Sequence, residues 1–313
     1  MDDLKSMQRQ LDDALKLLDN NDVSNRPDGE STNSLNHLQL NEAKSLIERC
    51  EKALEESRLN TKPTIRVIHH LACSGGTLVS KCLAALPNVF LLSELHPTSK
   101  LHMGGGKPKF LPADVITQAR YAKVPDIDAL AWKIFVNNIK TTENHVSRLG
   151  GHLVIREHTH SDFCVGDSFE KKSSVVEHLS SEFNVLRVAT LRDPIDSYLS
   201  LLSNNWEHFE PKGFAEYCKR VNTFISEYTS EQVFKYEDFV EDPKESIQKI
   251  AKVLDLPFSD SFLDTFDILK VTGDSGRSSD TISPRSRREI SKDLSKEMKN
   301  ERHYKILKEK FNY

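Results

Sequence analysis

TIRVIHHLACSGGTLVSKCL, residues 64–83, decides the fold, because it predicts a strand that runs through a glycine turn into a helix. Ile65, Val67 and Ile68 form a β-branched apolar run typical of a strand. The turn Ser74-Gly75-Gly76-Thr77 follows, and apolar residues with helical spacing come after it. Glycines allow backbone N–H groups to surround an anion, and a helix N-terminus adds its positive dipole end. The stretch therefore predicts a phosphate or sulfate site.

The glycine turn lacks the signature of an ordinary ATP-hydrolysing loop. That signature is Gly-x-x-x-x-Gly-Lys-Ser/Thr, in which the lysine contacts phosphates and the hydroxyl holds magnesium. No lysine follows Gly76, and no hydroxyl stands at the magnesium position. A P-loop kinase is therefore disfavoured.

Composition narrows the class of protein. The chain has 313 residues, with 43 Lys and Arg against 47 Asp and Glu, which gives no reason to expect nucleic-acid binding. Its five cysteines are odd in number and form no Cys-x-x-Cys pair, so we expect neither a disulfide framework nor a zinc knuckle. The N-terminus is charged and no long apolar run occurs, so we expect no signal peptide, no membrane span and a cytoplasmic protein.

Residues 1–62 differ from the rest of the chain. Apolar residues recur at three-and-four spacing over about 4–18 and again over about 38–54, and a polar stretch, 20–33, separates the two runs. This pattern predicts an N-terminal helical appendage with a flexible linker. Two interpretations stay open: a helical hairpin or helix docked on the main domain, or a short coiled coil that forms a homodimer.

Residues 63–313 predict an α/β domain with a parallel sheet flanked by helices, because strand and helix patterns alternate. Strands are expected at about 64–70, 88–93, 130–136, 152–157, 184–191 and 232–236. The glycine-rich basic segment 101–112 follows the second strand. It is either a lid or acceptor contact, or a surface loop without a role in binding.

A second anion motif follows the strand NVLRVATL, residues 184–191. The next segment is RDPIDSYLS, in which Arg192 stands at the carboxyl end of the strand. Its guanidinium can donate two parallel hydrogen bonds to a phosphate. Pro194 is suited to begin a helix, and Ser200 lies about two turns into it. Two anion sites on one sheet edge fit a nucleotide that is phosphorylated at two separate positions.

The chain at this point resembles the sulfotransferases that use 3′-phosphoadenosine 5′-phosphosulfate (PAPS). The family has a Ser-Gly-Thr-Thr-type turn for the 5′-phosphosulfate, and a strand-end Arg with Ser eight positions later for the 3′-phosphate. Here the turn is 74–77 and the pair is Arg192 and Ser200. FKYEDFVEDPKESIQKIAKVLDLPF, 234–258, is similar to a third family segment. The resemblance covers roughly 64–290 and implies a P-loop NTPase-like sulfotransferase fold.

The resemblance also implies which residues hold the nucleotide. Cys73 stands where the family usually places Lys or Arg, directly before the turn. Arg277, in the segment 273–277, matches the family's late basic loop and is expected to bind nucleotide. A further cation must meet the charge that develops on the leaving group. The candidates stay open: Lys81, Lys133, Arg156 and Arg277.

A general base is required near the transferring sulfur to deprotonate the acceptor. Glu94 ends the second strand, where many carbohydrate and protein sulfotransferases have a glutamate. His158 follows the strand at 152–157, where the cytosolic small-molecule enzymes have a histidine. Both stay candidates, and His96 and His160 are weaker ones. No metal is expected, because histidines that alternate after a strand point to opposite faces.

The sequence thus predicts a PAPS-dependent sulfotransferase, with PAPS as co-substrate and a hydroxyl or amine of a small molecule or glycan as acceptor. Two alternatives remain. One is a non-catalytic nucleotide-binding or scaffold protein of the same fold, for which Cys73 is the main evidence. The other is a P-loop kinase, against which the missing lysine argues.

Overall fold

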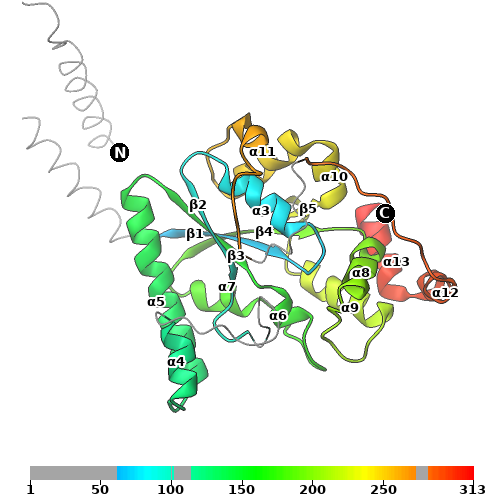
Figure 1. The fold of residues 1–313 in the computed structure, drawn as a ribbon, viewed down its shortest axis with the longest axis horizontal. Coiled ribbons are helices and arrows are strands. Elements are labelled where there is room, and N and C mark those ends of the chain that lie inside the picture. Colours follow the sequence, from blue (N-terminus) through cyan, green and yellow to red (C-terminus); the bar gives the residue numbers. More distant parts are fainter. Residues whose placement is uncertain (1–61, 100, 102–113, 273–280) are drawn as a thin grey trace, which may run out of the picture. The chain divides into compact units, whose positions relative to one another are not determined.

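The chain has an α/β fold in which helices flank a five-stranded parallel sheet (Figure 1). The computed structural model describes residues 62–99, 101, 114–272 and 281–313. The sheet has the order β2-β3-β1-β4-β5. Its strands are β1 (Thr64–His70), β2 (Val89–Leu95), β3 (His152–Glu157), β4 (Asn184–Leu191) and β5 (Val233–Lys235).

The central position of β1 determines where a ligand can bind. β1 pairs with β3 on one side, with Arg66 opposite Val154, and with β4 on the other side, with His70 opposite Thr190. The loop after β1 therefore lies between the carboxyl ends of β3 and β4. In open parallel sheets, ligands bind outside the carboxyl ends of the strands.

Five of the six predicted strands are present, and the one expected at 130–136 is wrong. That segment lies inside a long helix, α5 (Ile127–Arg148). Its buried residues Ala131, Phe135 and Ile139 are four apart, so they form one helical face. A short apolar run is compatible with a strand or with a buried helix, and here the longer 3.6-residue period decides.

Two layers of helices cover the sheet. On one face, α3 (Gly76–Ala84), α10 (Tyr236–Glu241) and α11 (Pro243–Val253) share a core with Ile68 and Val188. On the other face, α5 and α7 (Ser174–Leu179) pack on Val67 and Ile155. Figure 1 shows α3 and α11 on one side of the strands and α7 on the other. Strands buried on both faces are continuously apolar, as the sequence of β1 is.

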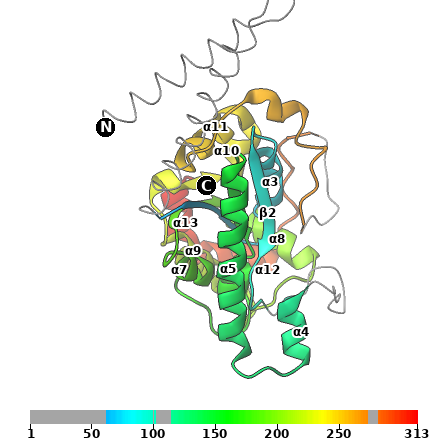
Figure 2. The same ribbon diagram turned by 90° about the vertical axis from the view of Figure 1, so that its left-hand side faces the viewer.

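A third core lies beyond β4. It is formed by α8 (Pro194–Ser203), α9 (Phe214–Ile225) and α13 (Arg302–Phe311), with Tyr217 and Leu307 fully buried in it. The remaining helices are α4 (Val115–Tyr121), α6 (His160–Phe163) and α12 (Lys292–Asn300), with two short 3-10 turns at Ser230–Gln232 and Asp260–Asp264. Figure 2 shows α4 beside the long helix α5.

Three predictions fall outside the described residues: the helices of 1–61, most of the 101–112 loop, and Arg277. Among the described residues, no helix has the length and apolarity that crossing a membrane requires.

Candidate functional site

The glycine turn has the geometry expected of a close backbone cradle. Gly75 adopts a left-handed conformation with φ 84°, and α3 begins at Gly76 without a side-chain cap. A Cβ atom on Gly75 would lie 2.2 Å from Cδ2 of Tyr236, and one on Gly76 would lie 2.2 Å from Cγ of His70. Neither position has room for a side chain. The turn therefore runs closely beside Tyr236 and His70 and leads directly into the N-terminus of α3, whose positive dipole end favours anions.

Arg156, near the end of β3, connects this turn to the neighbouring strands. Its guanidinium is buried and donates hydrogen bonds to Oγ1 of Thr77 at 2.8 Å and to Nε2 of His70 at 2.8 Å. It also donates to Oγ of Ser93 at 3.0 Å and pairs with Oε1 of Glu94 at 2.5 Å. One positive group therefore joins the glycine turn to the ends of β1 and β2. Arg156 is the predicted cation that the structure places at the turn.

Glu94, in β2, faces two histidines as well as Arg156. Its Oε1 lies 3.7 Å from Nε2 of His70, and its Oε2 lies 3.7 Å from Nε2 of His158. Burial raises the pKa of Glu94 to about 7, although the charge of Arg156 opposes this rise. Its backbone has φ 59°, at a register shift between β2 and β3. The two candidate bases are therefore brought together, as expected for two strand ends on one sheet edge.

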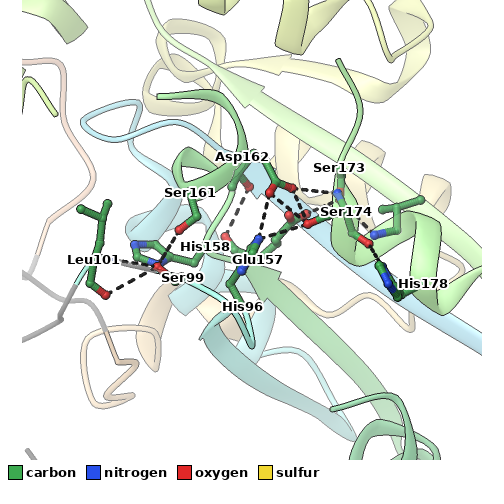
Figure 3. Close-up of polar contacts among 12 residues, drawn as sticks. His96, Ser99, Leu101, Glu157, His158, Ser161, Asp162, Ser173, Ser174 and His178 are labelled. Carbon is green, nitrogen blue, oxygen red and sulfur yellow. Dashed lines mark hydrogen bonds and ion pairs between the residues drawn. The ribbon is translucent and has the colours of Figure 1, made fainter. Parts of the chain in front are cut away.

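His158 is held by two serines. Its Nδ1 lies 3.1 Å from Oγ of Ser99 and 3.3 Å from Oγ of Ser161, and the two hydroxyls are 2.7 Å apart (Figure 3). Burial, together with the nearby charges of His96 and Arg156, lowers the pKa of His158 to about 4. His158 is therefore a neutral imidazole at pH 7. Between the two candidates, the Glu94 carboxyl has the pKa that suits proton transfer at neutral pH.

The predicted second anion motif lies beside the first. Nη1 of Arg192 donates to the carbonyl oxygen of Cys73, 3.5 Å away, and its guanidinium lies over the ring of Tyr236, 4.9 Å from the centroid. Ser200 is buried on α8, in the position that its spacing predicts. Cys73, with φ 68°, accepts a contact on Sγ from Nδ2 of Asn204 at 3.7 Å. The structure thus places Arg192 against the glycine turn.

Carboxylates around Arg192 support the backbone. Oδ1 of Asp193 caps α8 by accepting from N of Ile195 at 2.8 Å, and Oε1 of Glu237 accepts from N of Asp193 at 2.9 Å. Arg287 pairs with both Asp193 and Asp196. These acidic groups therefore position the segment that carries Arg192.

A cleft of about 480 Å³ opens next to the two candidate bases. Its lining includes Glu94, His96 and His158, together with residues of α4, among them Thr117 and Tyr121. Its size is in the range of small-molecule sites. The Glu94 carboxyl thus belongs to the lining of a cleft large enough for a small molecule.

The other predicted cations have different positions. Lys133 is exposed on α5, because its predicted strand is a helix. Lys81, another of the four candidate cations, is buried on α3. His96 bonds Oδ1 of Asp162 at 2.9 Å, which gives it a structural partner. Tyr236 had no individual prediction, although it belongs to the quoted segment 234–258 and packs on the turn.

No protein-family model and no curated protein matches this sequence. Similar solved structures include the sulfotransferase domain of an olefin synthase from Synechococcus PCC 7002, at 15% identity and a TM-score of 0.42, covering 81% of this chain and 98% of that one. Mouse sulfotransferase SULT7A1, complexed with PAP, has 12% identity and a TM-score of 0.41 over 80% of this chain and 89% of that one. Sulfotransferase STF1 from Mycobacterium tuberculosis H37Rv has 11% identity and a TM-score of 0.34 over 72% and 76%. All three TM-scores are below 0.5, so the function proposed below rests on the residues of the site.

Proposed function

We propose that the protein is a sulfotransferase that moves a sulfuryl group from PAPS to a hydroxyl or amine of a small molecule or glycan. One observation carries the proposal: Arg192 contacts the glycine turn that begins α3. A nucleotide with a 5′-phosphosulfate and a 3′-phosphate requires two anion sites on one sheet edge, and this pair of motifs supplies them.

The residues present fit such a nucleotide. The backbone of Ser74, Gly75, Gly76 and Thr77 would hold the 5′-phosphosulfate, because the two glycines carry no side chain of their own and the helix begins without a side-chain cap. Arg192 and Ser200 would hold the 3′-phosphate. PAPS supplies the activated sulfuryl group when it is bound. Phosphate contacts of this kind require no magnesium ligand, which agrees with the missing Lys-Ser/Thr signature.

Glu94 is the proposed general base. Its carboxyl lines the cleft, its Oε1 is held by Arg156, and its pKa of about 7 keeps a substantial fraction ionised at neutral pH. It would take the proton of the acceptor hydroxyl or amine as that group forms a bond to the sulfur; the bond between the sulfur and the nucleotide's 5′-phosphate would break, and 3′-phosphoadenosine 5′-phosphate would leave. Arg156 has a second proposed role: it supplies positive charge at Thr77, and so replaces the cation that Cys73 cannot provide.

The donor half of the proposal is tested with 3′-phosphoadenosine 5′-phosphate (PAP) by calorimetry. We expect saturable binding to the full chain without magnesium, and at least about tenfold weaker binding in Arg192→Ala, because a charge-assisted hydrogen bond to phosphate is worth about 1.5–3 kcal/mol. Arg302→Ala, an exposed arginine at the start of α13, is the matched control. No binding, or equal binding by the wild type and Arg192→Ala, would rule the proposal out.

The second candidate is a non-catalytic nucleotide-binding protein of the same fold. Cys73 favours it, because the residue directly before the turn carries no charge and its thiol contacts Asn204. This candidate predicts PAP binding without sulfate transfer. Incubation with labelled PAPS and a cell extract, followed by mass spectrometry of labelled products, distinguishes the two, since only the enzyme yields a labelled acceptor.

A further inference from the structure

Three side chains beside the cleft converge with unused electron pairs. One donor atom each from Glu94, His158 and His160 lies within 4.8 Å of one from each of the others. Oε2 of Glu94, Nε2 of His158 and Nδ1 of His160 are all buried, and none has a hydrogen-bond partner in the described part of the chain. Buried polar atoms normally find partners, so three such atoms in neighbouring residues call for an explanation.

The two histidines lie together because the strand ends before them. An extended strand would point alternate side chains to opposite faces, as the sequence-based argument against a metal assumed. However, β3 ends at Glu157, Thr159 has helical angles (φ −56°, ψ −33°), and α6 starts at His160. The rings of His158 and His160 are consequently in edge-on contact, with centroids 3.8 Å apart. That part of the argument against a metal is wrong.

We propose that Glu94, His158 and His160 form a binding site for one divalent transition-metal ion, with zinc as the best-matched probe. Two imidazoles and one carboxylate are a known zinc donor set, with bonds of about 2.0–2.1 Å and the fourth position left for water. Donor atoms in such a tetrahedral site lie roughly 3.3 Å apart. Oε2 of Glu94 and Nε2 of His158 are already 3.7 Å apart, so small side-chain shifts bring them to bonding distance.

The surroundings of His158 support its role as a metal ligand. When Nδ1 carries the proton and donates to Ser99 or Ser161, Nε2 presents a lone pair toward the Glu94 oxygen. Two acceptors then face each other, and a cation between them relieves the repulsion. Metal-bound histidines commonly have such a partner on the other ring nitrogen, which fixes the tautomer and the ring orientation. In Figure 3 both hydroxyls meet His158 on one side.

The positive charge of Arg156 disfavours a nearby metal ion, but Arg156 leaves one oxygen of Glu94 available to bind it. Its guanidinium binds Oε1 of Glu94, whereas the unpartnered oxygen is Oε2. A carboxylate has about four lone-pair sites and so can serve both cations. The other cluster of this kind in the described residues, His96 with Glu157 and Asp162, is less suitable, because His96 and Asp162 already bond each other.

The test is metal binding by the full chain, purified without a histidine tag. Co²⁺ is titrated and its visible absorption recorded, and Zn²⁺ binding is measured by calorimetry, both in the absence of nucleotide. We expect one strong site with intense bands of tetrahedral cobalt and no sulfur-to-cobalt charge transfer, because no cysteine is a ligand. Binding that shows the sulfur band, or no saturable binding, would overturn the proposal.

Variants assign the ligands. Glu94→Gln keeps the shape of the side chain, and His160→Asn removes one imidazole; each should weaken Co²⁺ binding by about tenfold or more. His145→Asn, at an exposed histidine of α5, should bind as the wild type does. Circular dichroism shows whether each variant is folded, and a folded Glu94→Gln with unchanged affinity overturns the assignment even if His160→Asn does not fold.

A regulatory consequence rests on the proposed function. Glu94 cannot hold a metal and also accept the acceptor's proton, so Zn²⁺ should inhibit sulfate transfer in proportion to occupancy, and chelation should restore it. A failure of the metal proposal can be distinguished from a failure of the proposed function, because metal binding is measured without PAPS and PAP binding is measured without metal.

Discussion

Replacing Arg156 by methionine tests the buried network on which the site depends. The variant keeps most of the side-chain volume but leaves the Glu94 carboxylate without its partner, 2.5 Å away, and removes the hydrogen bonds to Thr77 and Ser93. Both side chains of the pair are nearly inaccessible, at 2% and 5% exposure. Removing one member of a buried pair costs about 3–5 kcal/mol, which corresponds to a fall in Tm of about 6–20 °C at roughly 2–4 °C per kcal/mol.

The double variant isolates the pair itself. Glu94→Gln alone should cost about 1–3 kcal/mol, since a hydrogen-bonding amide replaces the carboxylate. Arg156→Met with Glu94→Gln should then cost at least about 1 kcal/mol less than the sum of the two, because no buried charge stays unpaired. Urea unfolding of the four proteins gives the coupling. Arg120→Met, at the exposed pair with Asp128, is the control and should cost about 1 kcal/mol or less. Additive effects would refute the idea that Arg156 and Glu94 act as one pair.

Two further predictions concern the anion motifs. Gly76→Ala places a methyl group 2.2 Å from Cγ of His70, so we expect the free energy of unfolding in urea to fall by about 1–3 kcal/mol and PAP binding to weaken. Gly150→Ala, whose added methyl group has nothing within 4 Å, should leave PAP binding unchanged. Equal PAP affinities of Gly76→Ala and the wild type would contradict a tight cradle. Arg287→Ala leaves Asp193 and Asp196 uncompensated beside Arg192, so PAP binding should weaken several-fold and more so at low salt, with a stability change of about 1 kcal/mol or less. Calorimetry at two ionic strengths measures this effect, and an affinity that does not change at either would contradict it.

The local pattern of apolar residues, glycines and prolines in the sequence was enough to predict most of the fold. The apolar runs predicted β1, β3 and β4 within a residue of their observed ends, because strands buried on both faces are continuously apolar. Glycine chemistry located the turn, and Pro194 marked the start of α8. The strand prediction for 130–136 was wrong because a run of seven residues, six of them apolar, is too short to separate a strand period from a helix period.

Which side chains contact one another within the site could be seen only in the tertiary structure. Arg156 was one of four candidate cations, and its sequence context did not distinguish it from Lys81 or Lys133. Its contacts with Thr77 and Glu94 join residues 79 and 62 positions apart. They depend on β3 lying between β1 and β2, an order that no local pattern contains.

The sequence by itself determined the class of fold and the two anion motifs, because each depends on residues next to one another in the chain: a strand, a glycine turn, a helix start, an arginine after a strand. Only the tertiary structure decided which charges meet. The sheet order brings Arg156 to the turn, and the early end of β3 brings His158 against His160 near Glu94. Burial then sets their protonation, because removing a carboxyl and an imidazole from water raises the pKa of Glu94 and lowers that of His158.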